Sequence, residues 1–194
     1  MHVEHIYPKA KTAHPNLKKK WRNFLLACPT CNTYKSQHLG ENKQNGLLKR
    51  FLWPHLDNTF NAFAYHKDGS LTIRDGLSAS LNTLAKATRE MLGLLKSPDV
   101  SQDYHGRGLA YDGITKRAQA WGMAEIALAA YTENQTPTQL DTINAMCSTI
   151  GHFSIWMEVF KNHPDVRKVV IRVSKAAPNC FDASTTRPIL RGRI

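Results

Sequence analysis

The spacing of apolar residues predicts a short extended region at the start of the chain. Large apolar groups cluster at residues 2–8 and again at residues 21–27, which predicts two short strands. A polar, lysine-rich stretch at residues 9–20 separates them and predicts a loop. Pro29 then precedes residues 31–39, a run without Gly or Pro that suits a short helix entered from a turn. The predicted order is strand, loop, strand, helix.

The pattern is mixed in the next part of the chain. Residues 46–53 are compatible with either a helix or a strand. Apolar runs at residues 60–65 and 70–73 flank the sequence Lys67-Asp68-Gly69, which is typical of a tight turn. We therefore expect a hairpin here.

Helical periodicity dominates the C-terminal half. Apolar positions recur at intervals of three and four residues and predict helices at residues 78–96, 111–133 and 138–162. Residues 166–173 are rich in β-branched side chains, and we interpret them as a strand. The tail from Ser174 onward contains two prolines and three arginines, and we expect it to be loosely held.

Together these elements predict an α+β fold that is predominantly helical. We expect a ββα motif at residues 1–45, a connecting hairpin region at residues 46–76, and a helical body at residues 77–194 that docks on a partner. Hydrophobic residues make up 42% of the 194 residues, enough for a buried core. No apolar run has the roughly 18 residues of a membrane span, and the start does not resemble a secretion signal. We expect a cytoplasmic protein without a membrane partner.

The charge favours a polyanionic partner. The chain carries 26 Lys and Arg against 15 acidic residues, a formal net charge of +11. Residues 1–60 hold only three of the acids, so the positive surplus lies in the N-terminal region. Neutralising phosphates releases condensed counterions, which makes such a region suited to nucleic acid. The candidate phosphate-binding residues are Lys18, Lys19, Lys20 and Arg22.

The same region contains the residue types that hydrolyse phosphodiesters. This reaction needs a base to deprotonate water and a metal ion to stabilise charge. Histidine changes charge near neutral pH, so His5 suits the first task. Glu4 and Asn32 offer oxygen donors appropriate to Mg²⁺ or Mn²⁺. Lys35 lies one helical turn beyond Asn32 and suits a phosphate contact, while Asn23 suits a hydrogen-bonded bridge across the loop.

One geometric condition applies to this interpretation. Neighbouring residues on a regular strand point to opposite faces, so Glu4 and His5 cannot both reach one site from an ideal strand. The interpretation needs an irregular backbone or a strand end at this position, and Pro8 lies close behind.

These motifs resemble the HNH endonuclease superfamily, in its His-Asn-Asn variant. The acid–His pair of that family corresponds to Glu4-His5, the central Asn to Asn23, and the last position to Asn32. The resemblance implies that His5 is the general base, that Glu4 and Asn32 bind one catalytic metal, and that Asn23 positions the loop. Glu at position 4 is a departure, because Asp is the commoner acid there.

Within that superfamily the chain is most similar to the PtuB group of HNH nucleases, found in Septu and certain retron anti-phage systems. The similarity is carried by V-E-H-I-Y-P-K at the start, by L-L-A-C-P-T-C-N-x-x-K, and by D-N-T-F-N-A-F-A-Y-H-K-D-G-S-L. It implies a DNA-cleaving defence subunit docked on an SMC/ABC-like (PtuA-like) ATPase. A retron reverse transcriptase with its DNA–RNA product is a further implied partner.

A structural zinc site is incomplete in this sequence. Cys28 and Cys31 form a C-x-x-C pair, but the second pair that usually precedes the acid–His strand has no room before Glu4. Cys147, Cys180 or His2 are the remaining candidates to complete it. The alternative function is therefore a non-enzymatic zinc-knuckle module that binds nucleic acid or protein.

Overall fold

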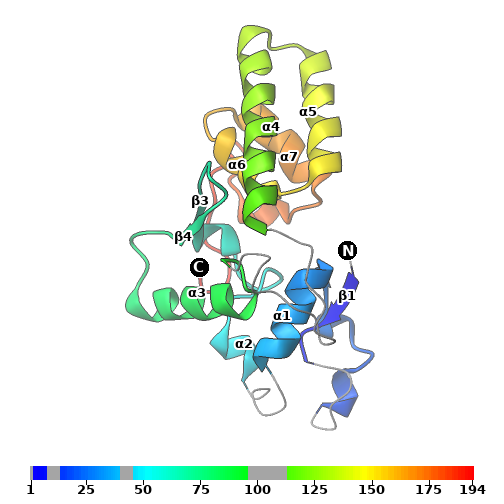
Figure 1. Ribbon diagram of the computed structural model, residues 1–194, viewed down its shortest axis with the longest axis vertical. Coiled ribbons are helices and arrows are strands. Elements are labelled where there is room, and N and C mark those ends of the chain that lie inside the picture. The colour runs from blue at the N-terminus through cyan, green and yellow to red at the C-terminus, as the bar shows by residue number, and fades with distance from the viewer. Residues whose placement is uncertain (1, 8–13, 40–45, 96–112) are drawn as a thin grey trace.

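The computed structural model describes residues 2–7, 14–39, 46–95 and 113–194. Seven helices and two small antiparallel sheets make up the regular structure of these residues, so the fold is α+β and predominantly helical, as predicted. Figure 1 shows helices α4 to α7 at one end of the molecule, and β1, α1 and α2 at the other. None of the helices in the described ranges is long and apolar enough to cross a membrane.

The N-terminal elements follow the predicted order of strand, loop, strand and helix. Strand β1 (His2–His5) pairs antiparallel with β2 (Phe24–Ala27), and helix α1 (Pro29–Leu39) follows directly. Strand β2 begins later than the apolar run predicts, because Trp21–Asn23 forms a single 3₁₀ turn. Another such turn, Pro15–Leu17, lies in the connection between the strands.

The middle of the chain forms a hairpin and two helices. Helix α2 (Leu47–Arg50) is short, and β3 (Phe63–Tyr65) pairs with β4 (Leu71–Ile73) as predicted. Helix α3 (Ala79–Met91) begins after Ser78, whose hydroxyl caps the first turn by accepting from the backbone of Leu81. Gly69 in the hairpin turn has a φ of +81°, and a Cβ there would lie 2.0 Å from the carbonyl oxygen of Ile114. The turn therefore packs closely on the start of the next helix.

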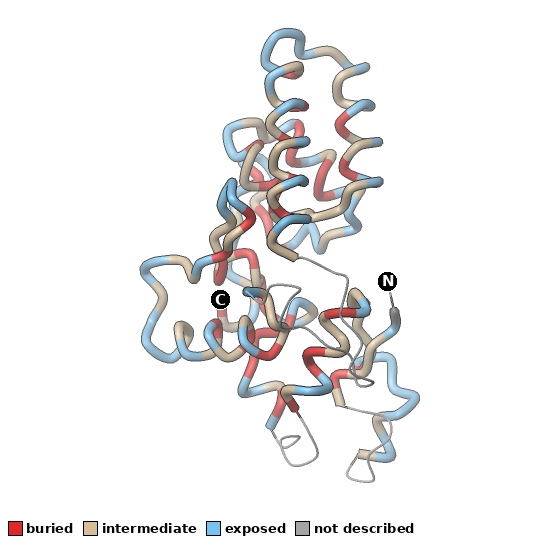
Figure 2. The backbone as a smooth tube through the Cα atoms, in the orientation of Figure 1, coloured by how far each residue is buried: buried red, intermediate tan, exposed pale blue. Residues whose placement is uncertain are grey.

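The helical body consists of the last four helices. They are α4 (Gly113–Glu133), α5 (Pro137–Ile150), α6 (Phe153–Val159) and α7 (Pro164–Val173). Their core is formed by Trp156, which is stacked on Phe160, together with Val166 and Val170. The buried positions lie where the helices face one another (red in Figure 2).

Two sequence-based predictions about this body are wrong. The predicted strand at residues 166–173 is helix α7: Pro164 starts it, and Val166 and Val170, four residues apart, are both buried against the core. Packing of this face outweighs the β-propensity of the branched residues. The predicted helix at residues 138–162 is two helices, because Gly151 (φ +72°) and His152 (φ +58°) adopt positive φ values between α5 and α6.

The C-terminal tail is also not loosely held, as the sequence led us to expect. Ile194 is 2% exposed and belongs to a core cluster with residues of the hairpin and α3. The amide of Asn58 donates to the carbonyls of Cys180 (2.7 Å) and Ile189 (2.9 Å). Arg193 binds the carboxylate of Asp57. The tail thereby connects the helical body to residues 49–58, which lie more than a hundred residues earlier in the chain.

Candidate active site

Lys35 lies buried between α1 and β1 and binds two groups of the strand. Its ammonium is 2.5 Å from the carboxylate of Glu4 and also donates to the backbone carbonyl of His5. The two side chains are 4% and 14% exposed, and charges so far from water are stable only when they are paired. Sequence reasoning assigned this lysine to a phosphate; the structure places it on Glu4, a contact across 31 residues that spacing along the helix could not indicate.

Asn32 lies near the start of α1. It precedes Lys35 by three residues on α1, so the two side chains share one helix face. Because Lys35 pairs with Glu4, that face is directed toward β1. Asn32 is half-buried. A carboxylate and an amide are the hard oxygen donors that Mg²⁺ or Mn²⁺ takes, so Glu4 and Asn32 are the candidate ligands, with one carboxylate oxygen of Glu4 bound by Lys35.

The imidazole of His5 has a different environment. His5 is the last residue of β1, and its ring contacts Phe24 edge to face at a centroid distance of 4.8 Å. Its Nε2 lies 3.1 Å from the carbonyl oxygen of Lys18. A carbonyl can only accept, so Nε2 carries the hydrogen in the neutral ring and Nδ1 keeps its lone pair. The contact therefore selects the tautomer in which Nδ1 can accept a proton.

Asn23 holds the loop that supplies this carbonyl. The Asn23 side chain is buried, accepts a hydrogen bond from the backbone N–H of Tyr7 (2.8 Å), and donates to the carbonyls of Tyr7 (3.0 Å) and Leu17 (3.1 Å). Leu17 is the neighbour of Lys18, whose carbonyl meets His5. Asn23 thus fixes the backbone on both sides of the imidazole. Sequence reasoning identified Asn23 but could not identify the partners, since they are backbone groups.

The structure divides the site residues into two groups. Glu4 and Lys35 form an ion pair between β1 and α1, with Asn32 three residues before Lys35 on α1, whereas His5 and Asn23 bind the loop. Adjacent residues of a strand point to opposite faces of the sheet, so the side chains of Glu4 and His5 lie on opposite faces of β1. His5 is the last residue of β1, and Lys35 links the two groups by donating to the carboxylate of Glu4 and to the backbone carbonyl of His5.

The four basic candidates belong to the same loop. Lys18, Lys19, Lys20 and Arg22 are all exposed. The three lysines precede the 3₁₀ turn Trp21–Asn23 that leads into β2, and Arg22 lies within it, close in the chain to the carbonyl that binds His5. Their ammonium and guanidinium groups are therefore available to phosphates beside the site.

Cys28 and Cys31 are in contact at the N-terminus of α1. The backbone N–H of Cys31 donates to the sulfur of Cys28 (3.2 Å). A hydrogen bond from the Cys31 thiol lowers the pKa of Cys28 to about 6, although burial opposes the shift. The hydrogen bond to Cys28 and burial raise the pKa of Cys31. Within the described ranges no three His, Cys, Asp or Glu side chains form a metal-binding group, so the pair lacks further zinc ligands there.

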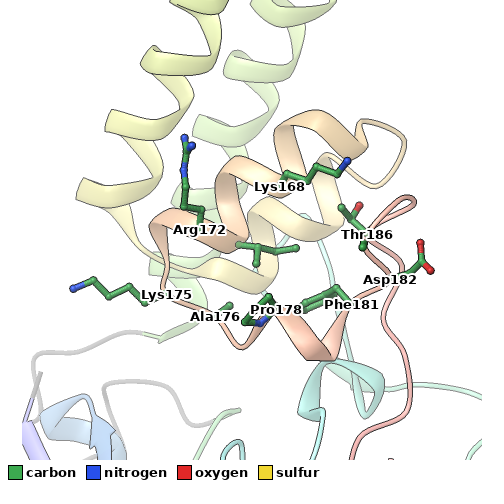
Figure 3. A pocket seen from close by; sticks show the side chains of 10 residues that line it. Lys168, Arg172, Lys175, Ala176, Pro178, Phe181, Asp182 and Thr186 are labelled. Carbon is green, nitrogen blue, oxygen red and sulfur yellow. The ribbon is translucent and has the colours of Figure 1, made fainter.

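A cavity of about 490 Å³ on the helical body is separate from this site. It lies between α7 and the tail, with Ile171 and Phe181 among its apolar lining residues. Figure 3 shows the charged ends of Lys168, Arg172 and Lys175 pointing away from it. No residue of the candidate site lines this cavity.

Comparison with known proteins finds a family match in the N-terminal segment. Residues 1–38 match the family model described as HNH endonuclease. The match covers 38 of the 194 residues and includes β1, β2 and most of α1, and with them all five site residues. The comparisons with curated proteins and with solved structures found no match. The family match indicates a nuclease function for this motif.

Proposed function

We propose that this protein is an HNH endonuclease that hydrolyses DNA phosphodiester bonds and depends on Mg²⁺ or Mn²⁺. The observation that supports it most strongly is the orientation of His5. Its Nε2 is held by the Lys18 carbonyl, and Asn23 fixes the loop that presents this carbonyl. An imidazole held in one tautomer at the end of a strand, adjacent in sequence to an acid and bound by a loop that carries exposed cations, is suited to activate water against a phosphodiester.

In the proposed reaction Nδ1 of His5 takes a proton from the water molecule that attacks phosphorus, and the P–O bond to the leaving oxygen breaks. Glu4 and Asn32 would hold the cation, which when bound stabilises the charge that develops on the phosphate and the leaving oxygen. Lys35 fixes the Glu4 side chain and the carbonyl of His5. Positive charge on the exposed loop residues binds the flanking phosphates.

We further propose that the nuclease acts in the cytoplasm as the effector of an anti-phage defence complex. The similarity of the V-E-H-I-Y-P-K and L-L-A-C-P-T-C-N segments to the PtuB group supports this. The partner in that role is an SMC/ABC-like ATPase, docked on the helical body, and a retron reverse transcriptase with its DNA–RNA product can be part of the complex.

The test is cleavage of supercoiled plasmid DNA by the purified protein, alone and in complex with its ATPase subunit. We expect nicking with Mg²⁺ or Mn²⁺, loss of nicking in EDTA, and loss of nicking in His5→Ala. The matched control is His66→Ala, which removes an exposed histidine of the hairpin region. Equal cleavage by wild type and His5→Ala would remove His5 as the base and with it this proposal.

A further inference from the structure

The face of the β1–β2 sheet that carries His5 is exposed and apolar. Val3 lies opposite Leu26 across the two strands, and the two residues are 64% and 70% exposed. His5 lies opposite Phe24, two residues along, so alternation places all four side chains on one face. Glu4 is on the other face, toward α1. A substrate that approaches the imidazole of His5 on this face of the sheet therefore contacts the apolar surface.

Trp21 extends the surface into an aromatic row. It lies in the 3₁₀ turn before β2 and is 87% exposed, whereas Trp53 and Trp156 are buried. Its ring meets Phe24 edge to face at a centroid distance of 6.1 Å, and Phe24 contacts His5 in the same way at 4.8 Å. The row leads from an exposed indole to the imidazole of the candidate site.

Positive charge borders this row. Lys18, Lys19, Lys20 and Arg22 are exposed next to Trp21 in sequence, and none of them forms an ion pair with another residue of the described ranges. A flat apolar group among exposed cations is complementary to a polyanion that exposes flat apolar groups of its own. An unpaired nucleic-acid strand has this chemistry, because its base faces are open, whereas a duplex encloses them.

We propose that Trp21 stacks on an unpaired base next to the phosphodiester whose hydrolysis His5 promotes, so that the substrate is a single strand or a locally unpaired duplex. The loop cations contact the neighbouring phosphates. This inference rests on the proposed nuclease function, because it places the phosphodiester bond that is hydrolysed next to His5. It assigns a binding role to Trp21, which lies in direct contact with the ring that touches His5.

Binding measured without cleavage tests the inference. Fluorescence anisotropy in EDTA compares a labelled oligonucleotide of about 20 nucleotides with the duplex of the same sequence. We expect wild type to bind the single strand more tightly than the duplex. Trp21→Ala should weaken single-strand binding about tenfold, leave the dependence on salt unchanged because no charge is lost, and leave thermal unfolding unchanged. Trp21→Phe should retain most of the affinity.

The control variant is Ile126→Ala, which removes an apolar side chain of α4 that is 64% exposed. It should bind both probes as wild type does. Equal single-strand affinity of Trp21→Ala and wild type would overturn the inference, as would tighter binding to the duplex. Failure of wild type to bind either probe would also overturn it. The nuclease function fails separately, through equal cleavage by His5→Ala and wild type.

Discussion

Arg193 encloses the carboxylate of Asp57 with three hydrogen bonds. Its Nε and backbone N–H donate to Oδ1 (3.1 Å each), and its Nη2 donates to Oδ2 (2.6 Å). Asp57 is 1% exposed, and the two residues are 136 positions apart. This contact is a main connection between the tail and the middle of the chain.

Arg193→Ala is therefore expected to lower the free energy of unfolding by about 3 kcal/mol, because it leaves a buried carboxylate without its partner. Urea denaturation followed by circular dichroism measures the change. Arg187→Ala is the matched control, since that side chain is exposed on the same tail. A change of equal size in both variants would show that the tail, and not the ion pair, carries the effect.

The same pair predicts a dependence of stability on pH. Burial raises the pKa of Asp57, but the hydrogen bonds from Arg193 and from the backbone of Trp53 outweigh it and hold this pKa below its usual range. A lowered folded-state pKa stabilises the protein above the unfolded pKa, and this contribution is lost as the pH falls through the folded pKa. Urea midpoints of wild type should therefore approach those of Arg193→Ala below about pH 4. A constant difference down to pH 2 would contradict this.

Lys35→Met is expected to reduce DNA cleavage and stability together. The substitution keeps the length of the side chain but leaves the carboxylate of Glu4 and the carbonyl of His5 without their donor. A buried polar group without a hydrogen-bond partner lowers the free energy of unfolding by about 1–3 kcal/mol. Urea denaturation can measure a change of this size. Lys49→Met, at an exposed lysine, is the control. Loss of cleavage with unchanged stability would instead favour the phosphate contact that the sequence predicts.

Asn23→Asp tests whether Asn23 positions His5. Aspartate has the same size, but its oxygen would face the carbonyls of Tyr7 and Leu17, to which the amide now donates. We expect cleavage to fall by about a hundredfold or more, because displacement of the loop moves the carbonyl that orients the imidazole. The ¹⁵N chemical shifts of His5 should show loss of the Nε2–H tautomer. Asn61→Asp, outside the site, should change neither quantity.

Cys28 should react with iodoacetamide as a thiolate in mildly acidic solution. Its pKa of about 6 means that the rate rises with pH and reaches half its maximum near pH 6. Cys31→Ala removes the hydrogen bond that lowers this pKa, so the midpoint should move upward. Cys147 is the internal reference, since burial raises its pKa. Mass spectrometry of the labelled peptides separates the sites, and equal rates for Cys28 and Cys147 at pH 6.5 would refute the prediction.

The sequence predicted those elements that local patterns determine. The ββα order, the hairpin turn at Gly69 and the helix that begins after Ser78 depend on spacing, turn residues and caps. The strand predicted for α7 failed because packing of Val166 and Val170 against the other helices overrides local preference. Contacts between distant residues, such as Arg193 with Asp57, leave no local pattern.

In the candidate site, too, the sequence indicates some features and leaves others undetermined. The order of Glu4, His5, Asn23 and Asn32 along the chain indicated them as the candidate residues. Their geometry was not predictable, because His5 is oriented by the backbone carbonyl of Lys18, and any residue at that position supplies a carbonyl. Trp21 was missed because a single aromatic residue in a basic loop has no spacing that indicates exposure.

Because the tail packs on residues 49–58, noncovalent contacts as well as the connecting chain hold residues 113–194 to the earlier part of the molecule. Arg117 of α4 adds bonds to the carbonyls of Gly69 and Leu94. If residues 1–95 and 113–194 were produced as separate polypeptides, we expect them to assemble on mixing. The protein would then be a natural starting point for a split reporter, in which neither fragment functions until both are expressed in one cell.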